Sequence, residues 1–274
     1  MPTNATKFTS KQLIPGQQLS VTDLRIQFKI TRGLTKAPNQ CDVTIHNLKE
    51  DTRHDLQRPL SVRVDAGYDG VQHQLFIGDL RFGMSEQDGP SWKSLLQVGD
   101  GARTYAHARV NKAYKGNTTY RQVITDAASA MGFAVPPALA SNSDLDREFN
   151  TGIAQRGPAR EELTRLLSVF GLHWSIQDGV LQVLTDDQLA NNDVLPVDKK
   201  HGMIGSPSYG TPPRSGKPPH MHVKMLLRPE IFPGCLIQLT SRDKNGKFRV
   251  ERVVHDGDTR TRESLKTQLE IKEA

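Results

Sequence analysis

The stretch VRVDAGYDGVQHQLFIG, residues 62–78, decides the fold class. Apolar side chains occupy every second position at its two ends, and Gly67 and Gly70 lie between them. Successive side chains of a strand point to opposite faces, so this alternation predicts two half-buried antiparallel strands. The glycine-containing segment between them predicts a hairpin turn.

The same period of two extends over residues 24–100. It recurs at residues 24–30 and 41–45, and the segments are separated by Gly, Asn and Asp. We therefore expect this block to be all-β. Phe76 and Trp92 are expected to be core aromatics rather than rim anchors.

Residues 101–187 change to a helical period. Thr118 or Thr119 can cap a helix whose apolar positions run to residue 131, and Gly132 follows where a glycine commonly ends a helix. This segment predicts the first helix of a small α+β unit.

A second helix and a hairpin complete that unit. Pro158 suits the first turn of a helix with an apolar stripe, and Gly171 marks its end. Residues 172–184 then alternate around Asp178-Gly179, a dipeptide that favours a type I′ turn.

The chain loosens from residue 185 to residue 219. Gly and Pro crowd residues 202–219, and such a stretch cannot sustain a helix or a central strand. Strands are expected to resume over residues 223–227, 236–240, 248–254 and 265–271.

The last block repeats the pattern of the first. Residues 236–250, LIQLTSRDKNGKFRV, resemble residues 62–78 in the order strand, glycine turn, strand. A third strand follows after a gap in each block, at residues 91–98 and 265–271. We therefore expect two similar small barrels around an α+β insert, since closure leaves no exposed strand edge.

Composition bounds the class of protein. The 274 residues carry a formal charge of +6, and no run of Lys and Arg exceeds two. Aromatic residues make up 6%, so no basic stripe interleaved with stacking rings points to a nucleic-acid reader. No stretch is apolar and long enough to cross a membrane, and the N-terminus has no apolar signal region. We expect the protein to be made in the cytosol.

Two histidine motifs are candidates for metal binding. His220 and His222 would lie on the same face of a strand, a known arrangement of metal ligands. No further ligand lies within a few residues, which favours solvated surface histidines. The sequence HDGD at residues 255–258 could suggest an acidic metal loop, but Asp and Gly favour a simple turn.

No catalytic constellation is evident. The chain lacks G-x-S-x-G, a Walker A motif and G-x-G-x-x-G between strand and helix. Its paired carboxylates lie in polar segments that would not separate their pKa values, namely Asp144 with Asp146, Glu161 with Glu162, and Asp186 with Asp187. Cys41 and Cys235 are expected to be small buried hydrophobes. We assign no catalytic, cofactor-binding or metal-binding residue.

The ordered series of segments resembles a known family. The series runs from VTIHNL and VRVDAGYDG through LFIGDL and LQVGDGAR to FGLHWSIQDGVLQVL, GMIGSP and LLRPEIFPGCLIQLTS. It is similar to the baseplate hub protein of contractile-tailed bacteriophages, a group that includes late-control protein D and the hub part of type VI secretion spikes. The resemblance covers about residues 20–272.

That resemblance implies a structural protein with two tail-tube-like antiparallel β-barrels and a small α+β domain. The expected domains are residues 1–100, the first barrel with an N-terminal segment; 101–187, the α+β domain; and 188–274, a linker and the second barrel. Members form homotrimers whose six barrels match the hexameric tail tube on one face and the trimeric spike on the other.

The resemblance also implies the partners and the location. The partners would be the tail tube protein, the spike or tail-tip protein, the tape measure protein and neighbouring baseplate proteins. DNA would pass through the channel only in transit, with no cofactor and no stable membrane association. The protein would be assembled in the host cytoplasm and reside in the virion.

Two other functions stay open. A distal-tail or tube-completion protein would form a hexamer with one barrel per chain. A cell-wall hydrolase would need a deep polar pocket in the α+β domain.

Overall fold

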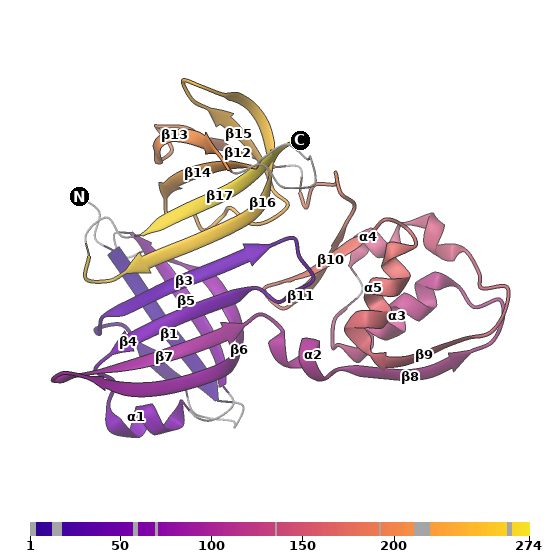
Figure 1. Ribbon diagram of the computed structural model, residues 1–274, viewed down its shortest axis with the longest axis horizontal. Helices are drawn as coiled ribbons and strands as arrows, with labels where there is room; N and C mark the ends of the chain where they lie inside the picture. The colour runs from indigo at the N-terminus through magenta and orange to yellow at the C-terminus, as the bar shows by residue number, and fades with distance from the viewer. Residues whose placement is uncertain are drawn as a thin grey trace. The chain divides into compact units, whose positions relative to one another are not determined.

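The computed structural model describes residues 4–12, 18–56, 60–68, 71–134, 136–191, 193–210, 220–261 and 265–274. The chain forms two compact units. Unit 1 comprises residues 1–33, 39–99 and 189–274, and unit 2 comprises residues 34–38 and 100–188. The structure confirms the predicted class, mainly β with an α+β insert (Figure 1). The division of unit 1 into two barrel domains stays a prediction.

Unit 1 is built on one continuous sheet of thirteen strands. The strands are β1 (Asn4–Gln12), β2 (Gln18–Val21), β3 (Ile26–Gly33), β4 (Gln40–His46), β5 (Leu60–Tyr68), β6 (Val71–Asp88), β7 (Ser91–Gly99), β12 (Val194–Val197), β13 (Met203–Tyr209), β14 (Met221–Leu226), β15 (Leu236–Thr240), β16 (Asn245–Asp258) and β17 (Lys266–Glu273). Their order is β13-β14-β17-β16-β3-β4-β7-β6-β5-β1-β2, with β15 beside β16 and β12 beside β15. All pairs are antiparallel except β12 with β15.

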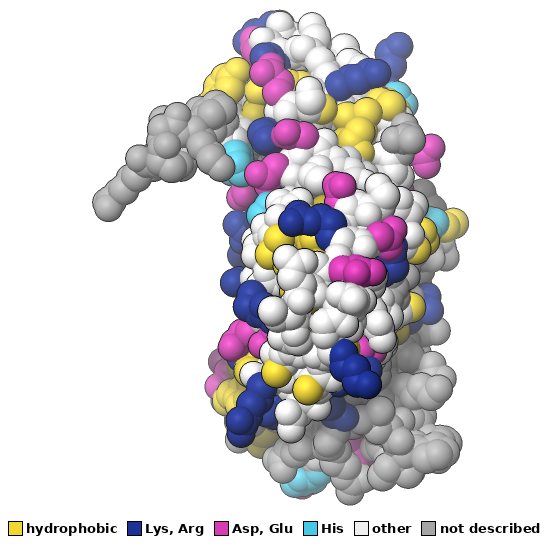
Figure 2. Space-filling model, turned by 90° about the vertical axis from the view of Figure 1, so that its right-hand side faces the viewer, with side chains coloured by type: hydrophobic (Ala, Val, Ile, Leu, Met, Phe, Trp, Pro, Cys, Tyr) yellow, Lys and Arg dark blue, Asp and Glu magenta, His cyan; other side chains and the backbone are white. Residues whose placement is uncertain are grey.

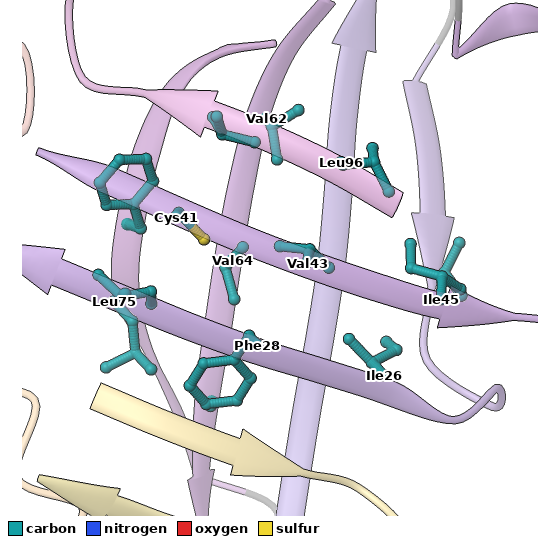
Figure 3. Close-up of a cluster of buried hydrophobic side chains, with 14 of the residues drawn as sticks. Ile26, Phe28, Cys41, Val43, Ile45, Val62, Val64, Leu75 and Leu96 are labelled. Carbon is teal, nitrogen blue, oxygen red and sulfur yellow. The ribbon is translucent and has the colours of Figure 1, made fainter. Parts of the chain in front are cut away.

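The sheet surrounds two hydrophobic cores. The first lies among β3 to β7, where the alternating side chains predicted from the sequence meet (Figure 3). Phe76 is fully buried there, as predicted. The second core is formed by β14 to β17 and includes Cys235, Phe248 and Met225. Each core supplies the apolar burial that holds its strands together.

Unit 2 is the predicted α+β unit with its own core. It contains α2 (Ala102–His107), β8 (Arg109–Tyr114), α3 (Tyr120–Ala130), α4 (Pro137–Ala140), the 3-10 helix η1 (Ser143–Asp146), β9 (Ile153–Pro158), α5 (Ala159–Ser168), β10 (His173–Gln177) and β11 (Val180–Leu184). None of the described helices is long and apolar enough to span a membrane.

The local signals in unit 2 are confirmed. The side chain of Thr119 accepts a hydrogen bond from the backbone N–H of Gln122, which makes it the N-cap of α3. Gly132 has φ +77°, the left-handed backbone that suits a glycine after a helix. Asp178 and Gly179 both have positive φ, as a type I′ turn between β10 and β11 requires.

One expectation about secondary structure in unit 1 is corrected, and the structure adds two strands that the sequence did not indicate. The block predicted to be all-β contains α1 (Glu50–Asp55), whose single turn and a half is too short to show a helical period. The loosened segment contains β12 and β13, which are edge strands among the described residues, and this agrees with the expectation that the Gly/Pro-rich stretch holds no central strand. Residues 211–219 of that segment lie outside the described residues, as do the hairpin residues 69–70.

Trp92 is not a core residue. Its side chain is half-buried, and the guanidinium carbon of Arg53 lies 4.1 Å from the centre of its ring. A cation over the face of an aromatic ring is attracted by its π electrons. Because one face of the Trp92 ring lies against this charged side chain and the residue is only half-buried, Trp92 lies at the rim of the core.

Candidate assembly surfaces

Unit 1 contains the same five-stranded arrangement twice. The first module is β3-β4-β7-β6-β5, and the second module is β13-β14-β17-β16-β15. In each, a hairpin lies beside a three-stranded meander, and the strands pair in the same order. The repeat predicted from the sequence therefore holds in the strand pairing and extends to the preceding hairpin.

The two modules also match residue by residue. β6 has a bulge between Leu80 and Phe82 in its pairing with β7, and β16 has one between Val250 and Arg252 in its pairing with β17. When these bulges are superposed and the strand registers are followed outward, the buried residues of β4 align with those of β14. The aligned pairs are Cys41 with Met221, Val43 with Val223, and Ile45 with Met225.

β16 joins the modules. Its first half pairs with β15, and its last seven residues pair on the same side with β3 of the first module. The motif HDGD at residues 255–258 lies in these last residues, so the predicted turn is wrong. Asp and Gly favour turns locally, but here the strand is held by pairing to β3 and β17.

The junction is closed by side chains as well. The hydroxyl of Tyr68 donates to the carbonyl of Leu265 at 2.9 Å and accepts from the backbone N–H of Leu227 at 2.9 Å. Leu227 and Leu265, although they flank strands of the second module, are buried in the first core. The two modules are therefore interlocked rather than loosely linked.

His255 is a buried polar residue at this junction. Its exposure is 1%, and its Nδ1 lies 3.0 Å from the hydroxyl of Thr267. Burial, aided by the charge of Arg32, lowers the pKa of His255 to about 3. The imidazole is neutral at physiological pH and serves packing rather than proton transfer.

On the face of the sheet opposite the two cores, charged side chains cross the junction between the modules. One cross-strand row consists of Lys266, Asp256, Lys29 and Asp42, on β17, β16, β3 and β4 respectively. The signs alternate, and directly opposed unlike charges stabilise neighbouring strands. We call this surface the polar face.

Ion pairs reinforce the polar face near the junction. Arg25 donates to both carboxylate oxygens of Asp258, with the closest contact at 2.6 Å. The pKa of Asp258 is lowered, because hydrogen bonds from Arg25 and from the Arg260 backbone outweigh the opposing effect of burial. Arg252 pairs with Glu270 at 3.3 Å.

The predicted histidine pair lies at the second module. His220 is exposed just before β14, and His222 is half-buried on it. Among the described residues, no three His, Cys, Asp or Glu side chains are grouped closely enough to hold a metal ion. The assignment of no metal ligand stays a prediction.

The carboxylate pairs do not face each other as an acid and a base. Asp146 pairs with Arg121 at 2.7 Å, and this hydrogen bond lowers the pKa of Asp146. Glu162 pairs with Arg165 at 2.5 Å, and Asp186 lies 3.0 Å from His173. One carboxylate of each pair thus lies beside a basic group, and such exposed ion pairs contribute little to stability.

An open hollow of about 700 Å³ lies in unit 1. It is lined by the segment before β13, by β13 itself and by the end of β15, and Lys199, Lys200 and Arg242 stand around it. Unit 2, where a hydrolase would need its pocket, contributes none of the described lining.

The cysteines are small buried hydrophobes, as predicted. Cys41 lies in β4 and Cys235 directly precedes β15, and neither is exposed. Burial raises the pKa of the Cys41 thiol far above its ordinary value and that of Cys235 to about 11. Neither is a reactive thiolate at neutral pH.

Surface charge of both signs is mixed. On the face shown in Figure 2, Lys and Arg side chains alternate with Asp and Glu over the described residues. No stripe of one sign, such as a nucleic-acid reader needs, is visible on that face.

No protein-family model and no curated protein matches the sequence. Solved structures do match the fold over nearly the whole chain. The 43 kDa tail protein of prophage MuSo2 from Shewanella oneidensis has a TM-score of 0.67 at 11% identity, and the match covers 98% of each chain. The chain has the fold of a phage tail protein.

Two further structures carry the same fold. A tail protein from Neisseria meningitidis has a TM-score of 0.63 at 13% identity, covering 99% of this chain and 97% of that one. A type VI secretion component of Escherichia coli, described as similar to tail proteins of bacteriophage T4, has a TM-score of 0.58 at 12% identity. The match covers 100% of this chain and 74% of the Escherichia coli chain. The likeness to phage tail and type VI secretion proteins inferred from the order of sequence segments is thereby confirmed at the level of the fold.

Proposed function

We propose that the protein is the baseplate hub of a contractile phage tail or tail-like particle. It forms a homotrimer that joins the hexameric tail tube to the trimeric spike. The observation that carries this proposal is the duplication of one five-stranded module within a single chain. Three copies of a two-module chain present six similar modules, so one ring can match sixfold symmetry on one side and threefold symmetry on the other.

The polar face supports a role as part of the DNA channel. The opposite face of each module is buried in its core, whereas the polar face is open to solvent and can line an aqueous passage. Its central row alternates Lys266, Asp256, Lys29 and Asp42. Affinity for DNA grows with the number of phosphates that Lys and Arg neutralise. Alternating charges therefore favour transit of DNA over its retention.

The remaining partners follow from the same position in the tail. The tube protein and the spike protein would contact the two ends of the ring, the tape measure protein would end at the channel, and neighbouring baseplate proteins would contact the outside. The role is structural and not enzymatic. The protein would be assembled in the host cytoplasm and reside in the virion baseplate.

The mass of the purified protein, measured by light scattering, tests the proposal together with negative-stain images of the same fraction. Rings of three 30.5 kDa chains with a central hole are expected. A ring of six chains would contradict the hub and support a distal-tail or tube-completion protein. If the purified chain stays monomeric at every concentration, it does not form the ring by itself, and this would contradict the expected assembly without other tail proteins.

The hydrolase alternative has a separate test. Alanine at Asp144, Asp146 or Glu161 leaves assembly unchanged if the role is structural. Loss of cell-wall cleavage in these variants, with the ring intact, would support the enzyme instead.

A further inference from the structure

Two strand segments of unit 1 have one side without a partner strand among the described residues. β13 pairs with β14 alone, and residues 82–88 of β6 pair with β7 alone, because β5 ends its pairing at Asp79. They lie at opposite ends of an eight-stranded layer, β13-β14-β17-β16-β3-β4-β7-β6 (Figure 1). Unpaired edges invite another strand.

The strand directions at the two ends are compatible with each other. Every neighbouring pair in the layer is antiparallel, and the number of strands is even. β13 and β6 therefore run in opposite directions. When one copy follows another around a ring, the β6 edge of the first meets the β13 edge of the second as an antiparallel pair.

The chain already contains such a contact once. By the alignment of bulges, β16 corresponds to β6 and β3 corresponds to β13. Within the chain, the end of β16 pairs with β3 and joins the two modules. Among the described residues, neither of the corresponding segments, the end of β6 and β13, pairs with a strand at this edge.

Exposure differs at corresponding positions in the way this missing partner predicts. Ile30 of β3 and Tyr209 of β13 occupy the same place in the two modules. Ile30 is fully buried, and Tyr209 is 65% exposed. Phe82 and Met84 on the β6 edge and Ile204 on β13 are also exposed apolar side chains. Large exposed apolar residues gathered at an edge indicate an interface.

We propose that residues 85–88 of β6 in one copy pair antiparallel with β13 of the next copy, in the register of the β16–β3 junction. This inference rests on the proposed trimer and names its subunit contact. His255 opposes Ile30 and Asp256 opposes Lys29 at the internal junction. By correspondence, Ser85 opposes Tyr209 and Glu86 opposes Ser208 across the subunit boundary.

A disulfide crosslink tests the register. Glu86→Cys with Ser208→Cys places two cysteines opposite each other, at a distance a disulfide can bridge. Both native cysteines are buried and stay out of the reaction. Mild oxidation is expected to shift the band from 30.5 kDa to the mass of a covalent trimer. The control pair, Phe82→Cys with Ile204→Cys, is offset by six residues, about 20 Å along the strand, and should stay uncrosslinked.

The outcomes separate this contact from the ring itself. Trimers by light scattering without a crosslink in the Glu86–Ser208 pair, or with one in the control pair, would overturn the contact and leave the hub in place. Failure of the unmodified chain to form a trimer would overturn both.

A single substitution gives a second test. Tyr209→Asp adds a charge at a site that is exposed in the isolated chain and buried in the proposed contact. The melting temperature of the monomer should stay the same while the trimer is lost. Val180→Asp, at a residue of unit 2 that is 63% exposed, should preserve the trimer. Equal behaviour of the two variants would contradict the contact.

Discussion

Removing the hydroxyl of Tyr68 tests whether the two modules are interlocked. In Tyr68→Phe, the N–H of Leu227 and the carbonyl of Leu265 lose their partner, and both residues are almost fully buried. A buried polar group left without a hydrogen bond costs about 1–3 kcal/mol. Tyr68 itself is half-buried, so water can recover part of the loss. We expect the free energy of unfolding to fall by about 2–3 kcal/mol.

Urea unfolding followed by far-UV circular dichroism measures this loss. The matched control is Tyr105→Phe, because the Tyr105 hydroxyl makes no hydrogen bond to the described residues and the ring is also partly buried. The control should change the free energy of unfolding by no more than about 0.5 kcal/mol. A loss in Tyr68→Phe no larger than in the control would refute the interlocked junction.

Three more substitutions test buried contacts. His255 keeps its pKa near 3 when folded and about 6.5 when unfolded, so the unfolded state gains a proton first as the pH falls. Between pH 6.5 and 4.5 the free energy of unfolding of the wild type should fall by about 2–3 kcal/mol more than that of His255→Gln. Parallel curves of unfolding free energy against pH for the two proteins would contradict this. Gly257→Ala brings a Cβ within 2.4 Å of Leu265 and 2.8 Å of Phe28. This overpacking should lower the free energy of unfolding by about 1–3 kcal/mol and reduce the melting temperature. An unchanged melting temperature would rule out this packing. Asp100→Ala removes the carboxylate that accepts from the backbone N–H of Gly179 at 2.7 Å, so amide hydrogen exchange there should become faster, and unchanged exchange would exclude this role.

The sequence predicted what is decided locally. Alternation located the core strands of both modules, because one face of each is buried against a core. Thr119, Gly132 and Asp178-Gly179 were identified correctly because caps and type I′ turns depend on a few neighbouring residues.

What depends on distant partners could not be predicted. Gly257 favours a turn in isolation, but in the fold the Phe28 ring and Leu265 pack where its side chain would be, and β16 continues through it. Trp92 looks like a core aromatic, yet Arg53 of a six-residue helix covers it. No periodic pattern in the sequence indicates either contact.

The candidate surfaces were likewise hidden. The alternating row on the polar face appears only when the registers of β17, β16, β3 and β4 are known. The internal repeat was visible in the sequence as a three-strand pattern. Its extension to β13 and β3, and with it the unpaired edges, required the sheet order.

Cryo-electron microscopy of the purified particle determines the rotational symmetry of the ring, and this symmetry distinguishes three chains of two modules from six chains of one module. We expect a ring of three chains in which six similar modules surround one hole, with exact threefold and approximate sixfold symmetry. A ring of six chains, each contributing one module, would contradict it.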